Sequence, residues 1–295
     1  MAAADASFPS DDSSGQTAAA IAGRLFVVGC ARSGTALLES FLAAHPAVLS
    51  FPETAVFARL LAGRQEGRSG PALPELRLQA GRARVTALLD ALQRPDLEGL
   101  MPGPDASVAA IARGFVAVLD RMALDQGKRW WVEKTPGNLA VVREIAHLVP
   151  GAKFISILRD GRQNVASLHD MALRYPDTWW ALFRDLDRAI ERWNTALRQT
   201  RRLRDVPEVL LVRYERLISE TEAVVEEMCR FTGLPFSREM IDRRAEAART
   251  VVATGAPWEA EALAEMRPAA EHKFNKLFSA EQKAYIESRL ERIDF

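Results

Sequence analysis

Four short apolar runs stand out along the chain, and a loop and a helical pattern follow each of them. The runs are residues 25–28, 130–132, 154–158 and 209–212. Uninterrupted apolar runs of this kind are typical of strands that are buried on both faces of a sheet. Because these strands alternate with helices, the pattern predicts an α/β protein of three layers, in which helices flank a central, mainly parallel sheet.

Two stretches break this pattern. Residues 1–20 have almost nothing to bury and are predicted to be a disordered tail, which leaves residues 21–295 as a single domain. Residues 64–125 begin with a stretch rich in Arg, Gly and Pro and are predicted to form a helical insertion beside the sheet. Two pairs of residues have the spacing of a capping box and predict helix starts near the C-terminus: Ser219 with Glu222, and Ser279 with Gln282.

The charges balance, since 39 Lys and Arg residues face 39 Asp and Glu residues. No net charge therefore draws the chain to nucleic acid or to an acidic membrane, and any anion site must be a local arrangement. Without an apolar run long enough for a bilayer, or the pattern of a signal peptide, we expect a cytoplasmic protein with no membrane span. The two cysteines, Cys30 and Cys229, lie far apart in apolar stretches and are expected to be reduced and buried.

Residues 29–36, GCARSGTA, are the most informative segment, because they follow a predicted buried strand and precede a predicted helix. Their glycines have the spacing of the phosphate loop of P-loop NTPases, G-x-x-x-x-G-K-S/T. Such a turn points backbone N–H groups and a helix N-terminus at an anion. Thr35 and Ala36 replace the lysine and the magnesium-binding hydroxyl, and Arg32 supplies the charge. The segment predicts a P-loop NTPase-like fold whose loop binds a phosphate other than a magnesium nucleoside triphosphate; the alternative is a plain glycine turn.

This loop resembles that of the sulfotransferases that use 3'-phosphoadenosine 5'-phosphosulfate (PAPS), a family whose fold is related to the P-loop kinases. Its members carry P-R/K-S-G-T-T-L, and residues 31–37 read ARSGTAL. The arginine form resembles the tyrosylprotein and related bacterial branches. The resemblance implies that Arg32, Ser33, Gly34 and Thr35 hold the 5'-phosphosulfate, with one hydroxyl missing where the second threonine is replaced.

A second family segment consists of an apolar strand, Arg-Asp, and a serine eight residues after the arginine. Here Arg159, Asp160 and Ser167 follow the apolar run 154–158 in that way. The resemblance implies that Arg159 and Ser167 bind the 3'-phosphate, and a planar guanidinium and a hydroxyl suit phosphate oxygens. The alternative for Arg159 is a surface ion pair with Asp160.

A third segment, residues 131–136, reads WVEKTP and resembles the E-K-S/T-P signature of several branches. There the lysine reaches the bridging oxygen of the donor, and a preplaced ammonium stabilises the charge that develops on the leaving phosphate. Lys134 is therefore a candidate catalytic residue together with Arg32. The alternative is a solvated lysine at a strand end. Glu133 is expected to pair with a basic group and is given no catalytic role.

Two further segments supply nucleotide-binding candidates by resemblance. Residues 212–217, VRYERL, resemble the V-x-Y-E-x-L segment late in the family, which predicts that Tyr214 is mainly structural and contacts the nucleotide. Residues 271–277, EHKFNKL, stand where members carry a basic loop over the 3'-phosphate, although the usual tryptophan is absent. Lys273 is the candidate in that segment.

Transfer to an alcohol also needs a base for the proton of the acceptor. In the tyrosylprotein-like branch this base is a glutamate shortly after the phosphate-loop helix, and Glu53 occupies that place near the end of a second strand. If Glu53 is buried, its pKa rises toward the working range. The alternative is that Glu53 interacts with the dipole of a helix at 54–61. Among the histidines, His169 is the rival base, because it lies just after Ser167.

Together these features predict a sulfotransferase that moves a sulfuryl group from PAPS to a hydroxyl or amine acceptor without a metal. The acceptor stays open among small molecules, glycans and peptides, and its pocket is expected along residues 54–125 and 168–200. The alternative enzyme is a P-loop kinase that uses ATP and Mg²⁺, in which Asp160 imitates a Walker B carboxylate. The alternative outside enzymes is a nucleotide-binding module that has lost catalysis.

Overall fold

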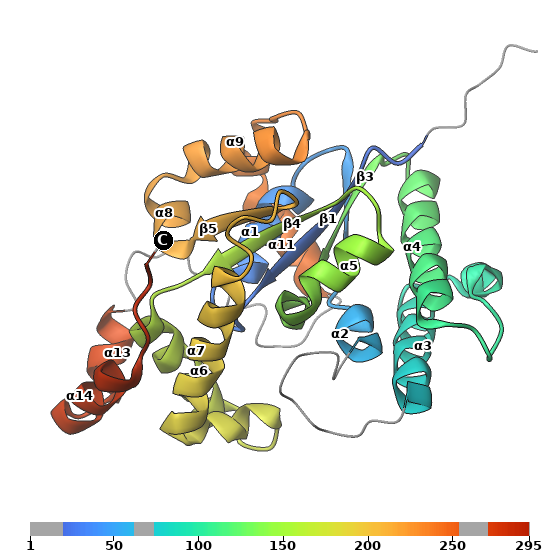
Figure 1. The fold of residues 1–295 in the computed structure, drawn as a ribbon. Coiled ribbons are helices and arrows are strands. Elements are labelled where there is room, and N and C mark those ends of the chain that lie inside the picture. The colour runs from blue at the N-terminus through green and yellow to red at the C-terminus, as the bar shows by residue number, and fades with distance from the viewer. Residues whose placement is uncertain (1–19, 62–73, 254–270, 295) are drawn as a thin grey trace, which may run out of the picture.

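The computed structural model describes residues 20–61, 74–253 and 271–294 of the chain (Figure 1). Within these residues the centre is a parallel sheet with the strand order β2-β3-β1-β4-β5. The strands are β1 (Gly23–Gly29), β2 (Val48–Phe51), β3 (Trp130–Lys134), β4 (Ala152–Leu158) and β5 (Val209–Arg213). The four predicted strands are confirmed, and the edge strand β2 ends just before Glu53. The predicted tail, residues 1–20, lies outside the described residues except for its last residue.

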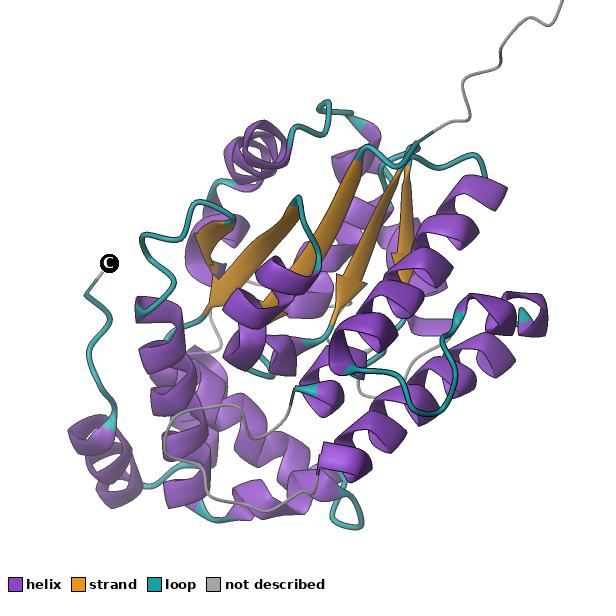
Figure 2. Cartoon of the chain, turned by 45° about the vertical axis from the view of Figure 1, so that its right-hand side comes forward, coloured by secondary structure: helices purple, strands orange, loops and turns teal. Residues whose placement is uncertain are grey.

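Helices flank the sheet on both faces, so the predicted three-layer arrangement is confirmed (Figure 2). The helices before β4 are α1 (Thr35–Ala43), α2 (Val56–Leu60), α3 (Pro74–Ala91), α4 (Val108–Asp125) and α5 (Val142–Leu148). Those after β4 are α6 (Gly161–Arg174), α7 (Leu186–Arg201), α8 (Tyr214–Ser219), α9 (Thr221–Thr232), α10 (Glu239–Asp242), α11 (Arg244–Ala253), α13 (Glu271–Leu277) and α14 (Ala280–Arg289). Short 3₁₀ segments are η1 (Pro95–Leu100), η2 (Pro136–Val141) and η3 (Trp179–Arg184).

The central strand β1 shows why the sheet is covered on both faces. Successive side chains of a strand point to opposite faces. In β1, Leu25 and Val27 pack with α1 and α9, whereas Phe26 and Val28 pack with α2, α4 and α5. All four side chains are fully buried. The loop that follows β1 therefore leaves from a close-packed centre, which fixes its starting point.

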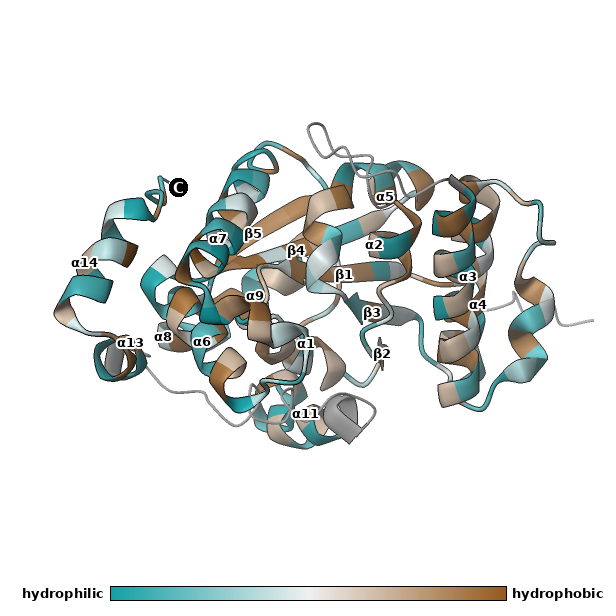
Figure 3. Cartoon of the chain, turned by 90° about the horizontal axis from the view of Figure 1, so that it is seen from below, coloured by the Kyte–Doolittle hydropathy of each residue, from teal (hydrophilic) through white to brown (hydrophobic). Residues whose placement is uncertain are grey.

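The hydropathy of the elements follows the same division. In Figure 3, β4 and β5 are brown along most of their length, whereas α7 and α14 mix brown and teal. Such amphipathic helices bury one side against the sheet or a neighbouring helix. Among the described helices, none combines the length and the apolar character that a membrane crossing needs.

The described part of the predicted helical insertion, residues 74–125, contains the helices α3 and α4, which lie next to each other beyond the β2–β3 edge of the sheet, whereas residues 64–73 lie outside the described residues (Figure 1). The helix α3 extends well beyond the short apolar pattern in its sequence. Its buried apolar side chains, Val85, Leu88 and Leu89, lie in its C-terminal half. Contacts of α3 with α2 place this region beside the segment that follows β2.

The two predicted helix starts near the C-terminus have different outcomes. Ser279 caps α14 and forms a full capping box with Gln282, as predicted. A helix does begin next to Ser219, but the predicted capping box is absent, because Ser219 is the last residue of α8. The next helix, α9, begins at Thr221 behind Glu220.

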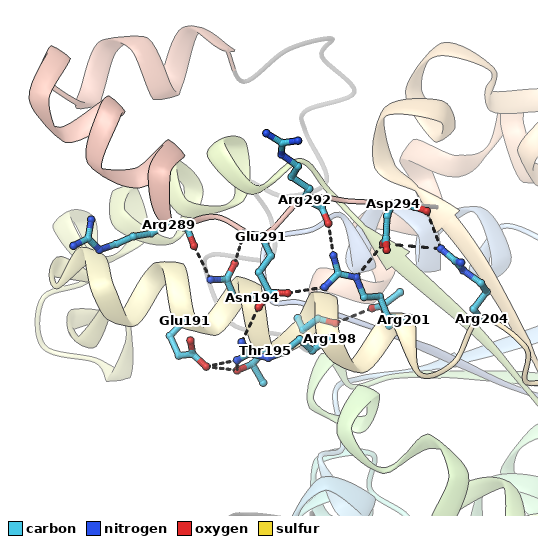
Figure 4. Close-up of polar contacts among 12 residues, drawn as sticks. Glu191, Asn194, Thr195, Arg198, Arg201, Arg204, Arg289, Glu291, Arg292 and Asp294 are labelled. Atoms are coloured by element: carbon cyan, nitrogen blue, oxygen red, sulfur yellow. Dashed lines mark hydrogen bonds and ion pairs between the residues drawn. The ribbon is translucent and has the colours of Figure 1, made fainter.

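Charged side chains tie the end of the chain to α7 (Figure 4). Arg201 donates from Nη1 to Glu291 over 2.6 Å and from Nε to Asp294 over 2.9 Å. The neighbouring Leu290 lies against Gly161 at the start of α6, where a Cβ would be only 3.0 Å from the leucine methyl groups. Exposed ion pairs contribute little singly, but this network holds the final segment along two helices.

Candidate active site

The carboxyl ends of the five strands meet at one edge of the sheet, because all the strands run in the same direction. The predicted site residues follow there: Cys30–Gly34 after β1, Glu53 after β2, Lys134 at the end of β3, Arg159 after β4 and Tyr214 after β5. Open α/β sheets bind their ligands at this edge. The fold thus brings motifs from five parts of the chain to the same edge.

The loop between β1 and α1 has the backbone of an anion-binding turn. Arg32 and Gly34 both adopt left-handed conformations, with φ of 67° and 96°. Glycine is required at position 34, because a Cβ there would lie 2.5 Å from Cδ2 of Tyr214. Thr35 is the first residue of α1, so the N-terminus of that helix faces the loop.

Asn164 of α6 holds the loop through hydrogen bonds, a role that no motif in the sequence indicates. Its Nδ2 donates to the carbonyl oxygen of Ala31 over 2.9 Å and to the hydroxyl of Ser33 over 3.0 Å. The thiol of Cys30 donates weakly to Asn164 Oδ1 over 3.6 Å. Ser33 is fully buried, so the structure uses its hydroxyl to shape the loop. A direct contact of Ser33 with a ligand stays a prediction.

The two predicted phosphate-binding motifs are in direct contact. Nε of Arg32 donates to the hydroxyl of Ser167 over 3.2 Å. Arg159 donates from Nη1 to the carbonyl oxygen of Arg32 over 3.4 Å and from Nε to Gln163 over 3.1 Å. Two guanidinium groups and a hydroxyl therefore share one region, and this combination suits phosphate oxygens.

Arg159 contacts Tyr214, Gln163 and the backbone of Arg32, which does not agree with the alternative that Arg159 forms an ion pair with Asp160. Its guanidinium lies over the ring of Tyr214, 4.3 Å from the ring centroid, which also occupies the face of Tyr214. The carboxylate of Asp160 accepts from the N–H of Gln163 over 3.1 Å and caps α6. The N–H of Asp160 donates to Glu215 over 2.8 Å. The carboxylate that a kinase would use for a metal is therefore employed as a helix cap.

Lys134 and Glu53, the two other catalytic candidates, form an ion pair. Nζ of Lys134 lies 3.3 Å from Oε2 of Glu53. The lysine side chain is 3% exposed, so it is not the solvated lysine of the alternative. The glutamate side chain is 42% exposed, so the burial that the sequence argument invoked for Glu53 is absent. An ammonium fixed in a buried position acts more strongly on nearby charge than one in water.

The buried carboxylate of the site is Glu133, which is fully inaccessible. Burial raises the pKa of Glu133, and hydrogen bonds from Thr135 and Thr54 oppose that rise. Asn138 donates a further bond over 3.1 Å. Among the described residues these partners are hydroxyl, amide and backbone groups, so the expected basic partner is wrong. The neighbouring Lys134 contacts Glu53 instead.

Arg84 of α3 is a second site residue that sequence reasoning missed. Its Nε donates to the carbonyl oxygen of Thr54 over 2.6 Å, and its Nη2 to that of Glu53 over 3.1 Å. These bonds fix the backbone beside the candidate base and bring the helical insertion to this part of the site. One arginine among many on a polar helix gives no sequence signal for such a role.

The rival base and the C-terminal candidate are both engaged by other elements. Nδ1 of His169 lies 3.0 Å from the carbonyl oxygen of Phe183 in η3. Nζ of Lys273, in α13, lies 2.7 Å from Asp170 of α6. These contacts join α6 to its neighbours. A nucleotide contact of Lys273 and a proton-transfer role of His169 stay predictions.

The fold and the site define an α/β protein of the P-loop type, whose sheet edge carries a cationic phosphate loop and a lysine–glutamate pair. The model of the sulfotransferase family matches residues 24–238, which include the phosphate loop and the lysine–glutamate pair but not Lys273. The chain belongs to the sulfotransferase family.

Curated relatives have similar sequences over most of this chain. Protein-tyrosine sulfotransferase 1 of Danio rerio is 28% identical over 216 residues, which are 72% of this chain and 54% of the relative. Protein-tyrosine sulfotransferase 2 of Gallus gallus is 27% identical over 221 residues, covering 72% and 52%. The chain therefore spans about half the length of these relatives.

Solved structures support the fold. The sulfotransferase domain from the curacin biosynthetic pathway has a TM-score of 0.51 at 22% identity, covering 74% of this chain and 76% of that chain. Mouse sulfotransferase SULT7A1, complexed with PAP, has a TM-score of 0.51 at 11% identity, covering 90% and 82%. At these identities the likeness concerns the fold alone, and it agrees with the predicted P-loop NTPase-like class.

Proposed function

We propose that this chain transfers a sulfuryl group from PAPS to a hydroxyl or amine acceptor. The observation that carries the proposal is the contact of the Lys134 ammonium with the Glu53 carboxylate, 3.3 Å apart, at the edge that also holds the phosphate loop. An ammonium stabilises the charge of a leaving phosphate, and a carboxylate accepts the proton of an acceptor. Membership of the sulfotransferase family supports the same reaction.

The residues around the loop fit a donor that carries two separate phosphate groups. Arg32, with the turn 33–35 and the N-terminus of α1, would hold the 5'-phosphosulfate. Arg159 and Ser167 would hold the 3'-phosphate, since both are joined to the loop through Arg32. When bound, PAPS supplies an activated sulfuryl group on a phosphate leaving group.

The two catalytic candidates have environments that suit different roles. Lys134 is buried, so its ammonium keeps a fixed position from which it can stabilise negative charge. Glu53 is half-exposed, so an acceptor can reach its carboxylate and pass a proton to it. Arg84 holds the backbone of Glu53 and so limits the movement of the base.

We further propose the hydroxyl of a tyrosine in a peptide as the acceptor. The names of the relatives, protein-tyrosine sulfotransferases, support this choice. A pocket of about 470 Å³ along the edge strand β2 also supports it, because residues from His45 to Pro52, next to Glu53 in the chain, line it. An extended peptide fits along an edge strand.

Two finer properties are proposals without direct support from the fold. Reaction without a metal is expected because Thr35 and Ala36 replace the residues that serve Mg²⁺ in P-loop NTPases. A cytoplasmic location is expected from the composition. Turnover in the presence of a chelator and localisation of the full-length protein would test them.

The first test is calorimetric titration with 3',5'-adenosine bisphosphate, with and without Mg²⁺, and with ATP as the control. We expect the bisphosphate to bind equally well with and without the metal. A preference for ATP with Mg²⁺ would move the phosphotransferase alternative to the front. Turnover with PAPS and tyrosine peptides, read as sulfated product by mass spectrometry, then tests the acceptor.

The second test assigns the chemistry to Lys134. Replacing it with methionine removes the ammonium but keeps the length of the side chain, and turnover should fall about 100- to 1000-fold. Lys153→Met is the matched control, because Lys153 lies at the amino end of strand β4, away from the strand ends that carry the site, and does not line the pocket along β2. Equal turnover of the two variants would remove Lys134 from the mechanism.

A further inference from the structure

We propose that Glu133 is a positioning residue, whose buried carboxylate sets the distance between the segments that carry Glu53 and Lys134. This inference rests on the proposed function and assigns a role to a residue that the sequence left without one. Glu133 itself makes no contact with the reacting groups in this role. It acts through the residues that follow Glu53 and Lys134 in the chain.

The carboxylate bonds directly to both segments. Its Oε1 accepts from the N–H of Thr54 over 3.2 Å and from the hydroxyl of Thr54 over 2.8 Å. The same oxygen accepts from the hydroxyl of Thr135. Thr54 follows Glu53, and Thr135 follows Lys134. One oxygen atom therefore joins the two chain segments at the point where each leaves its catalytic candidate.

The sheet cannot perform this task. The pairing of β2 with β3 runs from Val48 with Trp130 to Phe51 with Glu133, where it ends. Lys134 still pairs with Val27 of β1, but Glu53 lies beyond the last residue pair of β2 with β3, so backbone bonds of the sheet do not fix the separation of Glu53 from Lys134. Beyond the last residue pair of β2 with β3, hydrogen bonds to the side chain of Glu133 connect the two segments.

A second set of bonds reinforces the connection. The N–H of Ala55 donates to the hydroxyl of Thr135 over 3.0 Å, and the N–H of Val56 donates to the hydroxyl of Thr54 over 3.3 Å. Arg84 grips the carbonyl oxygen of Thr54 from the other side. The turn between β2 and α2 is thus bonded to the residues after β3 at several points.

Packing alone does not account for a carboxylate in this position. Removing a carboxylate from water is costly unless donors replace the water, and burial already raises the pKa of Glu133. An apolar side chain would fill the same space without that cost. The carboxylate provides what an apolar group cannot, namely several directed bonds from one atom to two segments.

Glu133→Gln is a matched variant that removes the charge but can keep the hydrogen bonds, because its partner Asn138 can turn its amide group. Nδ2 of Asn138 donates to Oε2 of Glu133 over 3.1 Å, and Oδ1 of Asn138 is buried without a hydrogen-bond partner in the described structure. In Glu133→Gln, Oε1 can still accept from Thr54 and Thr135. Turning the amide of Asn138 lets its Oδ1 accept from the new glutamine N–H.

The test compares Glu133→Ala with Glu133→Gln by turnover with PAPS and a tyrosine peptide. The alanine variant should lose about 100-fold in kcat, because displacement of reacting groups by about 1 Å has that effect. Its affinity for 3',5'-adenosine bisphosphate should stay within about threefold, since Arg32, Arg159 and Ser167 are untouched. The glutamine variant should recover kcat to within about fivefold of the wild type. Unchanged kcat in the alanine variant, or equal loss in both variants, would overturn the proposal.

If Glu133→Ala does not fold, the double variant Thr54→Val, Thr135→Val takes its place, because it keeps the carboxylate and cuts the hydroxyl bonds at almost constant volume. Hydrogen exchange at the amides of Thr54, Ala55 and Val56, without any substrate, gives a readout apart from activity. Faster exchange in Glu133→Ala but not in Glu133→Gln is expected. If the wild type shows no turnover, the proposed function fails, and the exchange data still decide whether Glu133 holds the two segments together.

Discussion

The guanidinium of Arg32 donates to the hydroxyl of Ser167 over 3.2 Å, although 135 residues separate them in sequence. Each residue belongs to a different predicted phosphate-binding motif, so the fold itself joins the two motifs into a single site. A site that is assembled in advance loses less ordering entropy on binding.

This contact predicts coupled losses of affinity for 3',5'-adenosine bisphosphate. Arg32→Ala and Ser167→Ala should each weaken binding, the arginine variant by about 10- to 100-fold, as expected for charge-assisted bonds. Calorimetric titration of both single variants and the double variant measures the coupling. Strictly additive losses would show that the two residues act apart.

Gly34 predicts a loss of stability on substitution by alanine. The residue has φ of 96°, and a Cβ would meet the ring of Tyr214 at 2.5 Å. Since the ring is also held by Arg159, it cannot move away freely. Urea unfolding of Gly34→Ala should show a decrease of at least about 1 kcal/mol in the free energy of unfolding. Gly127→Ala is the control, because Gly127 also has a positive φ but has open space around its Cβ position.

Asn164 predicts a combined effect on stability and ligand binding. In Asn164→Ala the carbonyl of Ala31 and the hydroxyl of Ser33 lose their donor inside the protein, which costs about 1–3 kcal/mol. Bisphosphate affinity should fall as well, because the loop loses its support. The exposed Asn275 gives the control variant, Asn275→Ala, and urea unfolding with titration measures both quantities. A stable Asn164→Ala protein with normal affinity contradicts this account.

The cysteines predict slow chemical modification of the folded protein. Both are free and buried, as the sequence predicted, and burial raises the pKa of each thiol to about 11. Near pH 8 only about one thiol in a thousand is then ionised, and the thiolate is the reactive form. A thiol reagent should therefore react slowly with the native chain and quickly with both cysteines in urea. Fast reaction of either thiol before unfolding would count against the packing around it.

Glu133 predicts how stability changes with pH. Because its pKa is raised in the folded state, its contribution is fully present below its ordinary value of 4.5 and is lost as the pH rises through the folded value. Glu133→Gln lacks this titration. The stability of the glutamine variant relative to the wild type should therefore be greater at about pH 8 than at about pH 5 in urea unfolding. A difference that does not change with pH would show that burial has little effect on this carboxyl.

The sequence identified the parts of the site whose signal is local. The phosphate loop follows a buried strand and has a glycine spacing, and Arg159, Ser167 and Lys134 stand in short motifs next to strands. The carboxyl ends of parallel strands lie at the same edge of a sheet, so the approximate position of these residues could be inferred from the sequence. The burial and the partners of a given side chain could not, which is why the sequence leaves the burial of Glu53 open and wrongly predicts a basic partner for Glu133.

The missed residues are those whose role depends on contacts between distant segments. Asn164 reaches the phosphate loop from α6, and Arg84 reaches the backbone of Glu53 from α3. Nothing in the surrounding sequence distinguishes them from other polar residues on helices. The capping pattern at Ser219 is a local signal that does not show the preceding helix, and Ser219 is the last residue of α8, one residue before the N-cap of α9.

The parallel pairing of β1 has a consequence for synthesis of the chain. Gly23 pairs with Trp130 and Arg24 with Ala152, so β1 leaves the ribosome long before either neighbour exists. Its apolar residues therefore stay exposed, or are covered by a chaperone, until β3 and β4 have been synthesised. Prolonged exposure of apolar residues favours aggregation. The phosphate loop, although it stands near the beginning of the sequence, can acquire its final shape only after α6 has emerged.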